Sequence, residues 1–367
     1  MSREESLRAG RLTSGVRPHG HRIMVVKMSK LSLPLAFGLL VAAAGNGMAT
    51  LQAEVVTELF PSKVIELAPP DSPEVAPVVS GIALDPTAKL LAVVGDDHLV
   101  RVLDADQGTV IQRLIGHTDW VKAAAFRPDG GVLATAGADR RIRLWELSAE
   151  KQARELAELP AAICAIAYSP DGRMLAAAGA DDKVWVFNTS DGRRLHELSG
   201  PGADLRALAF SPDGARLAAA GRSGAVRIWD AASGEQVADV QASSRRICAL
   251  AFSPDGKLLA VGGQQRLVRL LDAASGQPVA DLPERPGEVL SLCFCGNTIL
   301  ASAGSTNEIR LWNVATHQER NRLVGHTGSV TTMVYSAQAG TLISGSYDTT
   351  IRLWAVSGQN REKVTQR

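Results

Sequence analysis

Ile142-Arg-Leu-Trp-Glu146 is one of seven copies of a short pattern that runs through this chain at a nearly constant spacing. The other copies are Val100-Arg-Val-Leu-Asp104, Val184-Trp-Val-Phe-Asn188, Val226-Arg-Ile-Trp-Asp230, Val268-Arg-Leu-Leu-Asp272, Ile309-Arg-Leu-Trp-Asn313 and Ile351-Arg-Leu-Trp-Ala355. The large fourth residue stands at positions 103, 145, 187, 229, 271, 312 and 354, so the steps are 42, 42, 42, 42, 41 and 42 residues. A period in this range is typical of one supersecondary unit repeated in an array, so we expect a single repeat domain.

Each repeat contains four strand-like segments separated by turn residues. In one copy, Val121–Phe126 and Val132–Thr135 are apolar, Ile142–Trp145 alternates apolar and charged residues, and a polar segment follows near Ala153–Glu158. Between the first two lies Arg127-Pro-Asp-Gly130, in which proline sets φ for a turn and glycine is free to take positive φ. Short strands between turns indicate antiparallel sheet, and the polarity predicts an order from buried first strands to exposed last strands.

A four-stranded sheet of this size cannot bury both of its faces, whereas seven such sheets stacked in a ring can. The sequence therefore predicts an all-β fold, a seven-bladed β-propeller of four-stranded antiparallel blades. Gly116-His117, Gly325-His326, Trp229-Asp230 and the seven third-strand patterns resemble the motifs of the WD-repeat (tryptophan–aspartate repeat) β-propeller family. The resemblance covers about Val55 to Gly358 and implies a protein-binding scaffold.

The resemblance also implies a structural role for eight residues that could be mistaken for catalytic ones. The family holds a blade together with His, Ser or Thr, Asp and Trp, and two repeats contain all four. These are His117, Thr135, Asp139 and Trp145 in one repeat, and His326, Ser344, Asp348 and Trp354 in the other. Buried indole and imidazole groups need partners, which a hydroxyl and a carboxylate supply. In the other five repeats the set is incomplete, with Leu103, Phe187 and Leu271 in place of Trp, and we expect apolar packing there.

The last repeat lacks a fourth strand of its own, because the tail at 359–367 is polar. The N-terminal part offers two spare strands, Val64–Leu67 and Val55–Leu59. Closing the ring removes an open sheet edge, so we expect one of them to pair with the last blade, and favour Val64–Leu67. The predicted division is a closing strand and Pro-rich linker at 54–78, and the propeller at 79–358.

The N-terminal region predicts export. Residues 1–30 carry seven Lys or Arg and two acidic residues, which leaves 32 basic and 36 acidic residues, a balance of −4, for the rest of the chain. Leu31–Ala44 is an apolar run followed by small residues, with possible cleavage after Ala49 or Ala53. This pattern is typical of a secretory signal peptide and is short for a membrane span. We therefore expect an export signal region at 1–53 and an exported protein, periplasmic or secreted.

Alternatives to this interpretation are an uncleaved membrane anchor, a buried segment of the fold, and a true start at Met24 or Met28 rather than Met1. The balance of −4 after residue 30 argues against a nucleic-acid partner. Membrane contact is expected only through the N-terminal signal or anchor.

Catalytic and metal-binding signatures are missing from the sequence. It contains no GxSxG, P-loop, GxGxxG, HExxH or EF-hand pattern, so we expect neither enzyme activity nor a cofactor. Asp96-Asp97-His98 is the densest ligand-like cluster, but it lies in a turn where Asp is structurally expected, and we predict no metal. Cys164 and Cys248 occupy equivalent repeat positions, which indicates packing rather than a disulfide framework.

The best candidates for function are residues that vary between repeats in the loops that enter first strands and in the turns between second and third strands. Exposed aromatic and Arg side chains are typical interface anchors. The predicted partner-binding residues are Trp120, Lys122, Arg206, Arg222, Arg246 and Tyr347. The predicted function is a non-enzymatic, monomeric scaffold for a protein or peptide. The alternatives are a propeller enzyme (lactonase-like or another hydrolase), a small-ligand or glycan binder that uses the central channel, and a cytoplasmic assembly factor.

Overall fold

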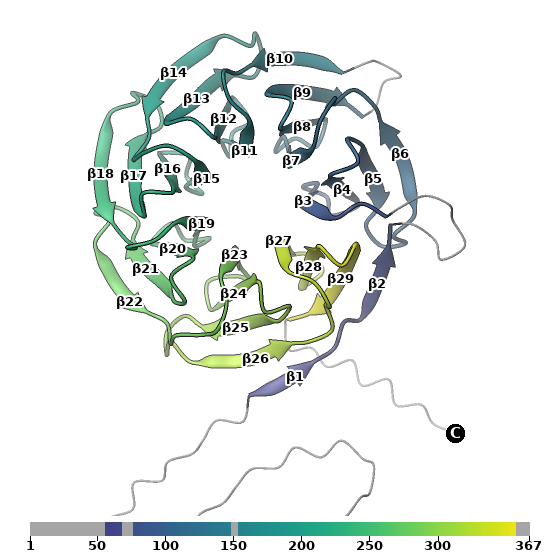
Figure 1. Ribbon diagram of the computed structural model, residues 1–367, viewed down its shortest axis with the longest axis vertical. Helices are drawn as coiled ribbons and strands as arrows, with labels where there is room; N and C mark the ends of the chain where they lie inside the picture. The colour runs from purple at the N-terminus through teal and green to yellow at the C-terminus, as the bar shows by residue number, and fades with distance from the viewer. Residues whose placement is uncertain (1–55, 68–75, 148–152, 357–367) are drawn as a thin grey trace, which may run out of the picture. The chain divides into compact units, whose positions relative to one another are not determined.

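The computed structural model describes residues 56–67, 76–147 and 153–356, which all belong to one compact unit, Glu54–Arg367. These residues form strands grouped into seven sheets around a central axis (Figure 1). The predicted fold, a seven-bladed β-propeller of four-stranded antiparallel blades closed by an N-terminal strand, is confirmed. No helix in the described ranges is both long and apolar enough to cross a membrane.

The inner half of each blade consists of its first and second strands. The first strands are β3 (Val79–Leu84), β7 (Val121–Phe126), β11 (Ile163–Tyr168), β15 (Leu205–Phe210), β19 (Ile247–Phe252), β23 (Val289–Phe294) and β27 (Val330–Ser336). The second strands are β4 (Leu90–Gly95), β8 (Val132–Gly137), β12 (Met174–Gly179), β16 (Arg216–Gly221), β20 (Leu258–Gly263), β24 (Ile299–Gly304) and β28 (Thr341–Ser346). We number the blades 1 to 7 in this order.

The outer half of each blade consists of its third and fourth strands. The third strands are β5 (Val100–Asp104), β9 (Arg141–Glu146), β13 (Lys183–Asn188), β17 (Ala225–Asp230), β21 (Val268–Asp272), β25 (Ile309–Asn313) and β29 (Thr350–Ala355). The fourth strands of blades 1 to 6 are β6 (Val110–Leu114), β10 (Arg154–Glu158), β14 (Arg194–Ser199), β18 (Gln236–Gln241), β22 (Pro278–Asp281) and β26 (Glu319–Leu323).

Burial does not fall steadily from the first strand to the fourth. In blade 2, β8 is buried at every position, whereas β7 is fully buried only at its two ends. The predicted order is therefore wrong for the first strands. Each first strand is the inner edge strand of its sheet, so its unpaired edge lines the central channel, whereas a second strand has a paired strand on each side.

The ring is closed by β2 (Lys63–Glu66), which pairs antiparallel with β29 and becomes the fourth strand of blade 7. It lies in the segment that the sequence favoured. A preceding strand, β1 (Thr57–Leu59), was not expected to pair elsewhere, but it joins β26 of blade 6 in parallel (Figure 1). The N-terminal segment thus joins two neighbouring blades. The remaining domain boundaries stay a prediction, because residues 1–55 and 357–367 lie outside the described ranges.

Apolar side chains fill the spaces between neighbouring blades. Trp145 of blade 2 packs with Ala92, Val94 and Val102 of blade 1, and Trp354 of blade 7 packs in the same way against blade 6. Small Ala side chains in the second strands leave room for these indoles, since neighbouring blades must lie close together. Each blade is therefore held by the one before it, and the ring provides a rigid frame for its loops.

Candidate functional site

One backbone irregularity recurs in all seven blades and forms the candidate site. The pairing of first and second strands skips one residue directly after the start of each first strand. Such a bulge re-aims the side chain of the extra residue. The seven extra residues, which we call the bulge ring, are Ser80, Lys122, Cys164, Arg206, Cys248, Leu290 and Thr331.

Two members of the bulge ring join blades to one another. The Ser80 hydroxyl donates a hydrogen bond to the carbonyl of Val121 in blade 2, at 2.5 Å, and the Thr331 hydroxyl donates to the carbonyl of Val79 in blade 1, at 2.6 Å. Both hydroxyls therefore bridge to the next blade. Four other members, Lys122, Cys164, Arg206 and Cys248, have no hydroxyl and do not form this bridge, and neither does the fifth, Leu290.

Those four, with the non-bridging Leu290, line a channel cavity of about 310 Å³ whose remaining walls are mostly small or apolar residues. Its charged side chains are Lys122 and Arg206, and no imidazole or carboxylate is among the described lining residues. Burial raises the pKa of the Cys248 thiol, which therefore stays protonated near neutral pH. A protonated thiol is a poor nucleophile. The cavity thus provides positive charge and a small apolar space.

The turns between second and third strands lie beside the loops that enter the first strands. In six blades a turn N–H donates a hydrogen bond to the carbonyl of the residue that precedes the first strand. The pairs are Ala138 with Trp120, Ala180 with Ala162, Arg222 with Asp204, Gln264 with Arg246, Ser305 with Glu288 and Tyr347 with Ser329. We call the surface formed by these loops and turns the mouth face. Of the predicted partner-binding residues, Trp120, Arg222, Arg246 and Tyr347 lie on it. Lys122 and Arg206 follow directly, as bulge residues at the start of β7 and β15, and line the channel at this opening.

A carboxylate joins two of the predicted residues. Asp204 accepts Arg206 Nε at 2.6 Å and Arg246 Nη2 at 2.7 Å. Asp204 has a φ of 58°, a left-handed conformation. The carboxylate of blade 4 thus holds one guanidinium from its own blade and one from blade 5. Arg222 lies beside them, because its backbone N–H donates to the Asp204 carbonyl at 3.2 Å.

Two aromatic residues flank the same mouth. Lys122 Nζ lies 5.6 Å from the centre of the Trp120 ring, a cation–π distance. Trp120 is half-buried, and its Nε1 has no hydrogen-bond partner among the described residues. Burial raises the pKa of Tyr347, while the charge of Arg206 acts to lower it. Tyr347 lies in the second-to-third turn of blade 7, and its backbone N–H donates to the carbonyl of Ser329 at the entry to β27. Partner binding by these residues stays a prediction.

Sequence reasoning missed the bulge ring and the bridge through Asp204. A signal for the ring was present, since its members at 80, 122, 164, 206 and 248 differ by the 42-residue repeat step. No comparable signal predicts the bridge, because only the fold brings two guanidinium groups, one from each of two blades, to the carboxylate of Asp204.

The first of the two four-residue sets forms a closed network in blade 2. His117 Nδ1 lies 2.7 Å from the Asp139 carboxylate, and His117 Nε2 lies 2.7 Å from the Thr135 hydroxyl. Trp145 Nε1 donates to that hydroxyl at 2.8 Å. Every polar atom is used if His117 carries its proton on Nδ1, so the network favours the neutral imidazole. Burial lowers the pKa of His117, although the Asp139 carboxylate acts in the opposite direction.

Blade 7 repeats the arrangement. His326 lies 2.8 Å from both the Asp348 carboxylate and the Ser344 hydroxyl, and Trp354 Nε1 donates to Ser344 at 2.8 Å. Although burial acts to raise it, the pKa of Asp348 is well below its usual range because His326 and Thr350 donate hydrogen bonds to its carboxylate. Both networks are buried against a neighbouring blade, where no substrate could reach them. Their geometry is that of a structural support.

Blade 6 contains a partial version that the sequence interpretation overlooked. Trp312 Nε1 donates to Ser302 Oγ at 2.8 Å. At the positions of His117 and Asp139, four residues before the first strand and six before the Trp, this blade has Arg285 and Thr306. In blade 3 an indole also finds a carboxylate, since Trp185 Nε1 donates to Asp181 at 3.2 Å. The sequence predicted apolar packing in all the incomplete blades. Blades 3 and 6 differ from that prediction, because each has a buried indole that donates a hydrogen bond to a polar side chain.

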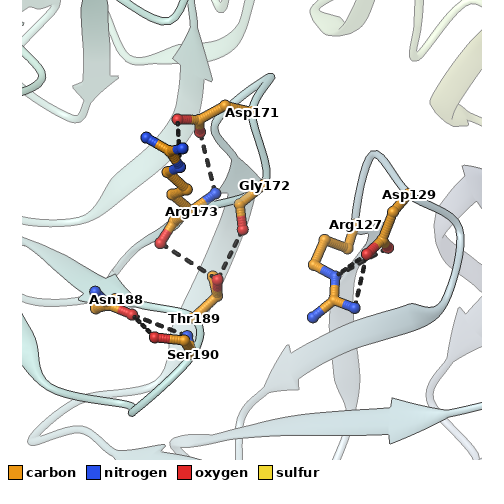
Figure 2. Close-up of a pocket in the computed structure, with 8 residues that line it drawn as sticks. All are labelled: Arg127, Asp129, Asp171, Gly172, Arg173, Asn188, Thr189 and Ser190. Atoms are coloured by element: carbon orange, nitrogen blue, oxygen red, sulfur yellow. Dashed lines mark hydrogen bonds and ion pairs between the residues drawn. The ribbon is translucent and has the colours of Figure 1, made fainter.

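A larger hollow, of about 560 Å³, lies between the turns of blades 2 and 3 on the face opposite the mouth (Figure 2). Its lining residues are Arg127, Asp129, Asp171, Gly172, Arg173, Asn188, Thr189 and Ser190. Arg127 pairs with Asp129, and the Asp171 carboxylate accepts the backbone N–H of Arg173 (Figure 2). The Thr189 hydroxyl donates to the carbonyl of Gly172. Because these groups bond within or between the turns that form the hollow, they stabilise those turns.

The ligand-like cluster at 96–98 is also engaged in structural bonds. Asp96 accepts the backbone N–H of Val78 at 3.0 Å, and Asp97 pairs with Arg101 at 2.6 Å. No group of three or more His, Cys, Asp or Glu residues within the described ranges is arranged to hold a metal ion. The four cysteines are free thiols.

Two family models match the chain. The model described as IFT122 first beta-propeller matches residues 148–367, and the model described as WD domain, G-beta repeat matches residues 108–146. The first match spans more than half of the chain, and the second covers most of blade 2.

Individual relatives match over shorter stretches. Periodic tryptophan protein 2 homolog of Neurospora crassa is 36% identical over 61 residues, 17% of this chain and 7% of the relative. Periodic tryptophan protein 2 of Saccharomyces cerevisiae is 33% identical over 67 residues, 18% of this chain and 7% of the relative. Protein ROOT INITIATION DEFECTIVE 3 of Arabidopsis thaliana is 41% identical over 59 residues, 16% and 14% of the two chains. These matches cover a small fraction of each relative. They show similarity in the repeat and do not extend to the activity of a whole protein.

The relatives overturn the expected localisation. They are proteins of fungi and of a plant, three of them periodic tryptophan protein 2 or its homologs, and they contradict the prediction of an exported, periplasmic, secreted or membrane-anchored protein, which is wrong. The pattern at residues 1–53 that led to it lies outside the described residues. The repeat spacing, the seven blades and the family match agree with one another, and the chain belongs to the WD-repeat β-propeller family.

Proposed function

We propose that this protein is a non-enzymatic scaffold that binds a protein or peptide on its mouth face, centred on the channel opening. The observation that carries the proposal is the convergence of Trp120, Lys122, Arg206, Arg246 and Tyr347, from blades 2, 4, 5 and 7, around one opening. Aromatic and Arg side chains dominate the binding energy of protein interfaces. The packed blades hold these five side chains in place. The mouth face is therefore a preorganised surface, which lowers the entropic cost of binding.

The walls of the channel favour this proposal over a hydrolytic enzyme. Hydrolysis needs an activated nucleophile or a general acid and base within reach of a substrate. The described channel lining has two cations, two thiols and small or apolar side chains. The His and Asp residues of the two buried networks are occupied with each other, so they are not available for acid–base chemistry.

A double substitution tests the proposal. Trp120→Ala combined with Arg206→Ala removes an aromatic anchor and a cation from the mouth, and we expect capture of specific partners from a lysate to fall at least about tenfold. The matched control is Phe60→Ala combined with Arg193→Ala, which removes an exposed aromatic and an exposed Arg elsewhere on the ring. Quantitative mass spectrometry of the captured proteins compares the variants, and thermal melting checks that both remain folded. Equal capture by the double variant and the control would contradict the mouth-face assignment.

A further inference from the structure

We propose that the mouth face of blades 4 and 5 forms an arginine sector, Arg206, Arg222, Arg245, Arg246 and Arg266, that binds an acidic peptide segment of the partner. This inference rests on the scaffold function proposed above and specifies the chemistry of the partner. Its starting point is a concentration of positive charge that the repeat pattern does not require. The equivalent turns of blades 1 and 3 instead carry Asp96-Asp97 and Asp181-Asp182.

Backbone hydrogen bonds hold the loops of the sector together. The turn N–H of Arg222 donates to Asp204, and the Ser243 N–H donates to the carbonyl of Gly224 in the same turn, at 2.9 Å. In blade 5 the Gln264 N–H donates to the carbonyl of Arg246 at 2.9 Å. The Ser244 N–H, next to Arg245, donates to Gln265 Oε1 at 3.3 Å. These bonds make one continuous surface from the turn of blade 4 to the turn of blade 5.

Most of the charge in the sector is not neutralised. Asp204 is shared by two of the five guanidinium groups. The side chains of Arg222, Arg245 and Arg266 are exposed and form no ion pair or hydrogen bond with the part of the chain that the structure describes. Arginine presents a planar fork of donors that matches a carboxylate bidentately. Three free forks beside a bridged pair therefore provide several carboxylate-binding positions.

A buried arginine lies next to the sector. Arg285 donates its backbone N–H to the carbonyl of Arg266 at 2.8 Å, and the residue is only 2% exposed. Like the networks at the equivalent positions of blades 2 and 7, its side chain is out of reach of a partner, so we assign it no ligand contact. The exposed guanidinium groups of the sector are the ones that would bind the peptide carboxylates.

The surroundings favour a short acidic peptide over a nucleic acid. Glu284 and Glu288 border the sector on the side of blade 6, and Asp181 and Asp182 border it on the side of blade 3. A long phosphate backbone would extend onto these carboxylates and be repelled by them. A nucleic-acid site also needs a broad basic surface, which a chain with a balance of −4 after residue 30 does not provide.

The experiment measures binding of a fluorescently labelled glutamate-rich peptide to the whole protein. Its comparison ligands are a glutamine-rich peptide of the same length and an oligouridylate of the same charge. The test variant is the triple substitution Arg222→Gln, Arg245→Gln and Arg266→Gln. The control is Arg173→Gln, Arg193→Gln and Arg320→Gln, which removes three equally exposed charges outside the mouth face.

We expect the wild type and the control to prefer the glutamate peptide, and the test variant to bind it about tenfold more weakly. The preference should weaken as salt is raised, because exposed charges are screened. Equal binding of the two peptides by the wild type, equal loss in both triple variants, or tighter binding of the oligouridylate would overturn the proposal. The capture test with Trp120→Ala and Arg206→Ala uses other variants and another measurement, so none of these outcomes changes its result. Failure of the arginine sector is therefore distinguishable from failure of the scaffold function.

Discussion

Blades 2 and 6 place different residues on almost the same backbone. In blade 2 the indole of Trp145, a hydroxyl, an imidazole and a carboxylate form one closed set of hydrogen bonds. In blade 6 the bond from Trp312 to Ser302 is kept, but the other two positions hold Arg285 and Thr306, whose side-chain polar atoms have no partner among the described residues.

The difference separates two contributions to the stability of a blade. Trp312 is 1% exposed and Trp145 is 4% exposed, so the indole is buried equally well with or without the His–Asp pair. The packing of Trp against the preceding blade is therefore the common requirement. The His–Asp pair is an addition that satisfies polar groups in blade 2, and its absence leaves such groups unsatisfied in blade 6.

The largest expected effect comes from removing the shared element. Trp145→Ala should lower the free energy of unfolding by about 3–5 kcal/mol, because it empties a large buried site between blades 1 and 2. Chemical denaturation measures the change, and Trp312→Ala in blade 6 should give a loss of similar size. An unchanged denaturation midpoint for either variant would show that the indole is not the common support.

Removing the carboxylate should affect only the complete blade. Asp139→Ala leaves buried donors of His117 and its neighbours without an acceptor, and we expect a loss of about 1–3 kcal/mol. The matched change Thr306→Ala in blade 6 removes a hydroxyl that has no partner in the described structure, so it should be close to neutral. Equal losses in the two blades, measured by denaturation, would contradict the distinction between them.

Adding a carboxylate to blade 6 should make it more like blade 2. Thr306→Asp places a negative charge at the position of Asp139. If it faces Arg285 as Asp139 faces His117, it pairs with the guanidinium, and we expect a gain of about 1 kcal/mol. Arg285→Leu in the same background should abolish the gain. A lower melting temperature for Thr306→Asp alone would indicate that the two side chains do not meet.

The smallest effect expected is a dependence of stability on pH. Because the pKa of His117 is lowered by folding, the unfolded chain binds the proton first, so stability is lost as pH falls below the unfolded value of 6.5. The lowered pKa of Asp348 acts in the same direction below its unfolded value of 3.8. Melting temperatures between pH 7 and pH 5 should fall for the wild type and fall less for His117→Gln. Identical slopes for the two proteins would exclude His117 as the titrating group.

Much of the architecture was predictable because a repeat encodes it seven times. The spacing of the third-strand pattern predicted the number of blades, and the motif spacing identified both complete networks before their distances were known. The partial network of blade 6 was also readable, since Ser302 precedes Trp312 by the same ten residues that separate Thr135 from Trp145. It is harder to recognise than the complete sets, because blade 6 has Arg285 in place of the histidine that marks them.

Three other features differ from what the sequence predicted: the burial of the first strands, the localisation and the pairing of β1. A pattern along the chain does not show which strands end up at a sheet edge or which segments pair. An apolar first strand looks fully buried in sequence, but its unpaired edge lines the channel. The apolar run at 31–44 suggested export, a reading that the relatives contradict. The parallel pairing of β1 with β26 could not be anticipated, since a three-residue strand has no pairing signal of its own.

By itself, the sequence determined the number of repeats, the order of strands in a blade and the residues of the buried networks. Each of these depends on local periodicity or on a fixed spacing within one repeat. Only the tertiary structure decided what surrounds the channel mouth. Arg206 and Tyr347 are 141 positions apart in the chain, yet closing the ring brings them to one opening, and the bulges aim the residues that line it. The pairing of Asp204 with two arginines follows from the same closure, because it depends on the approach of neighbouring blades and not on any pattern within one.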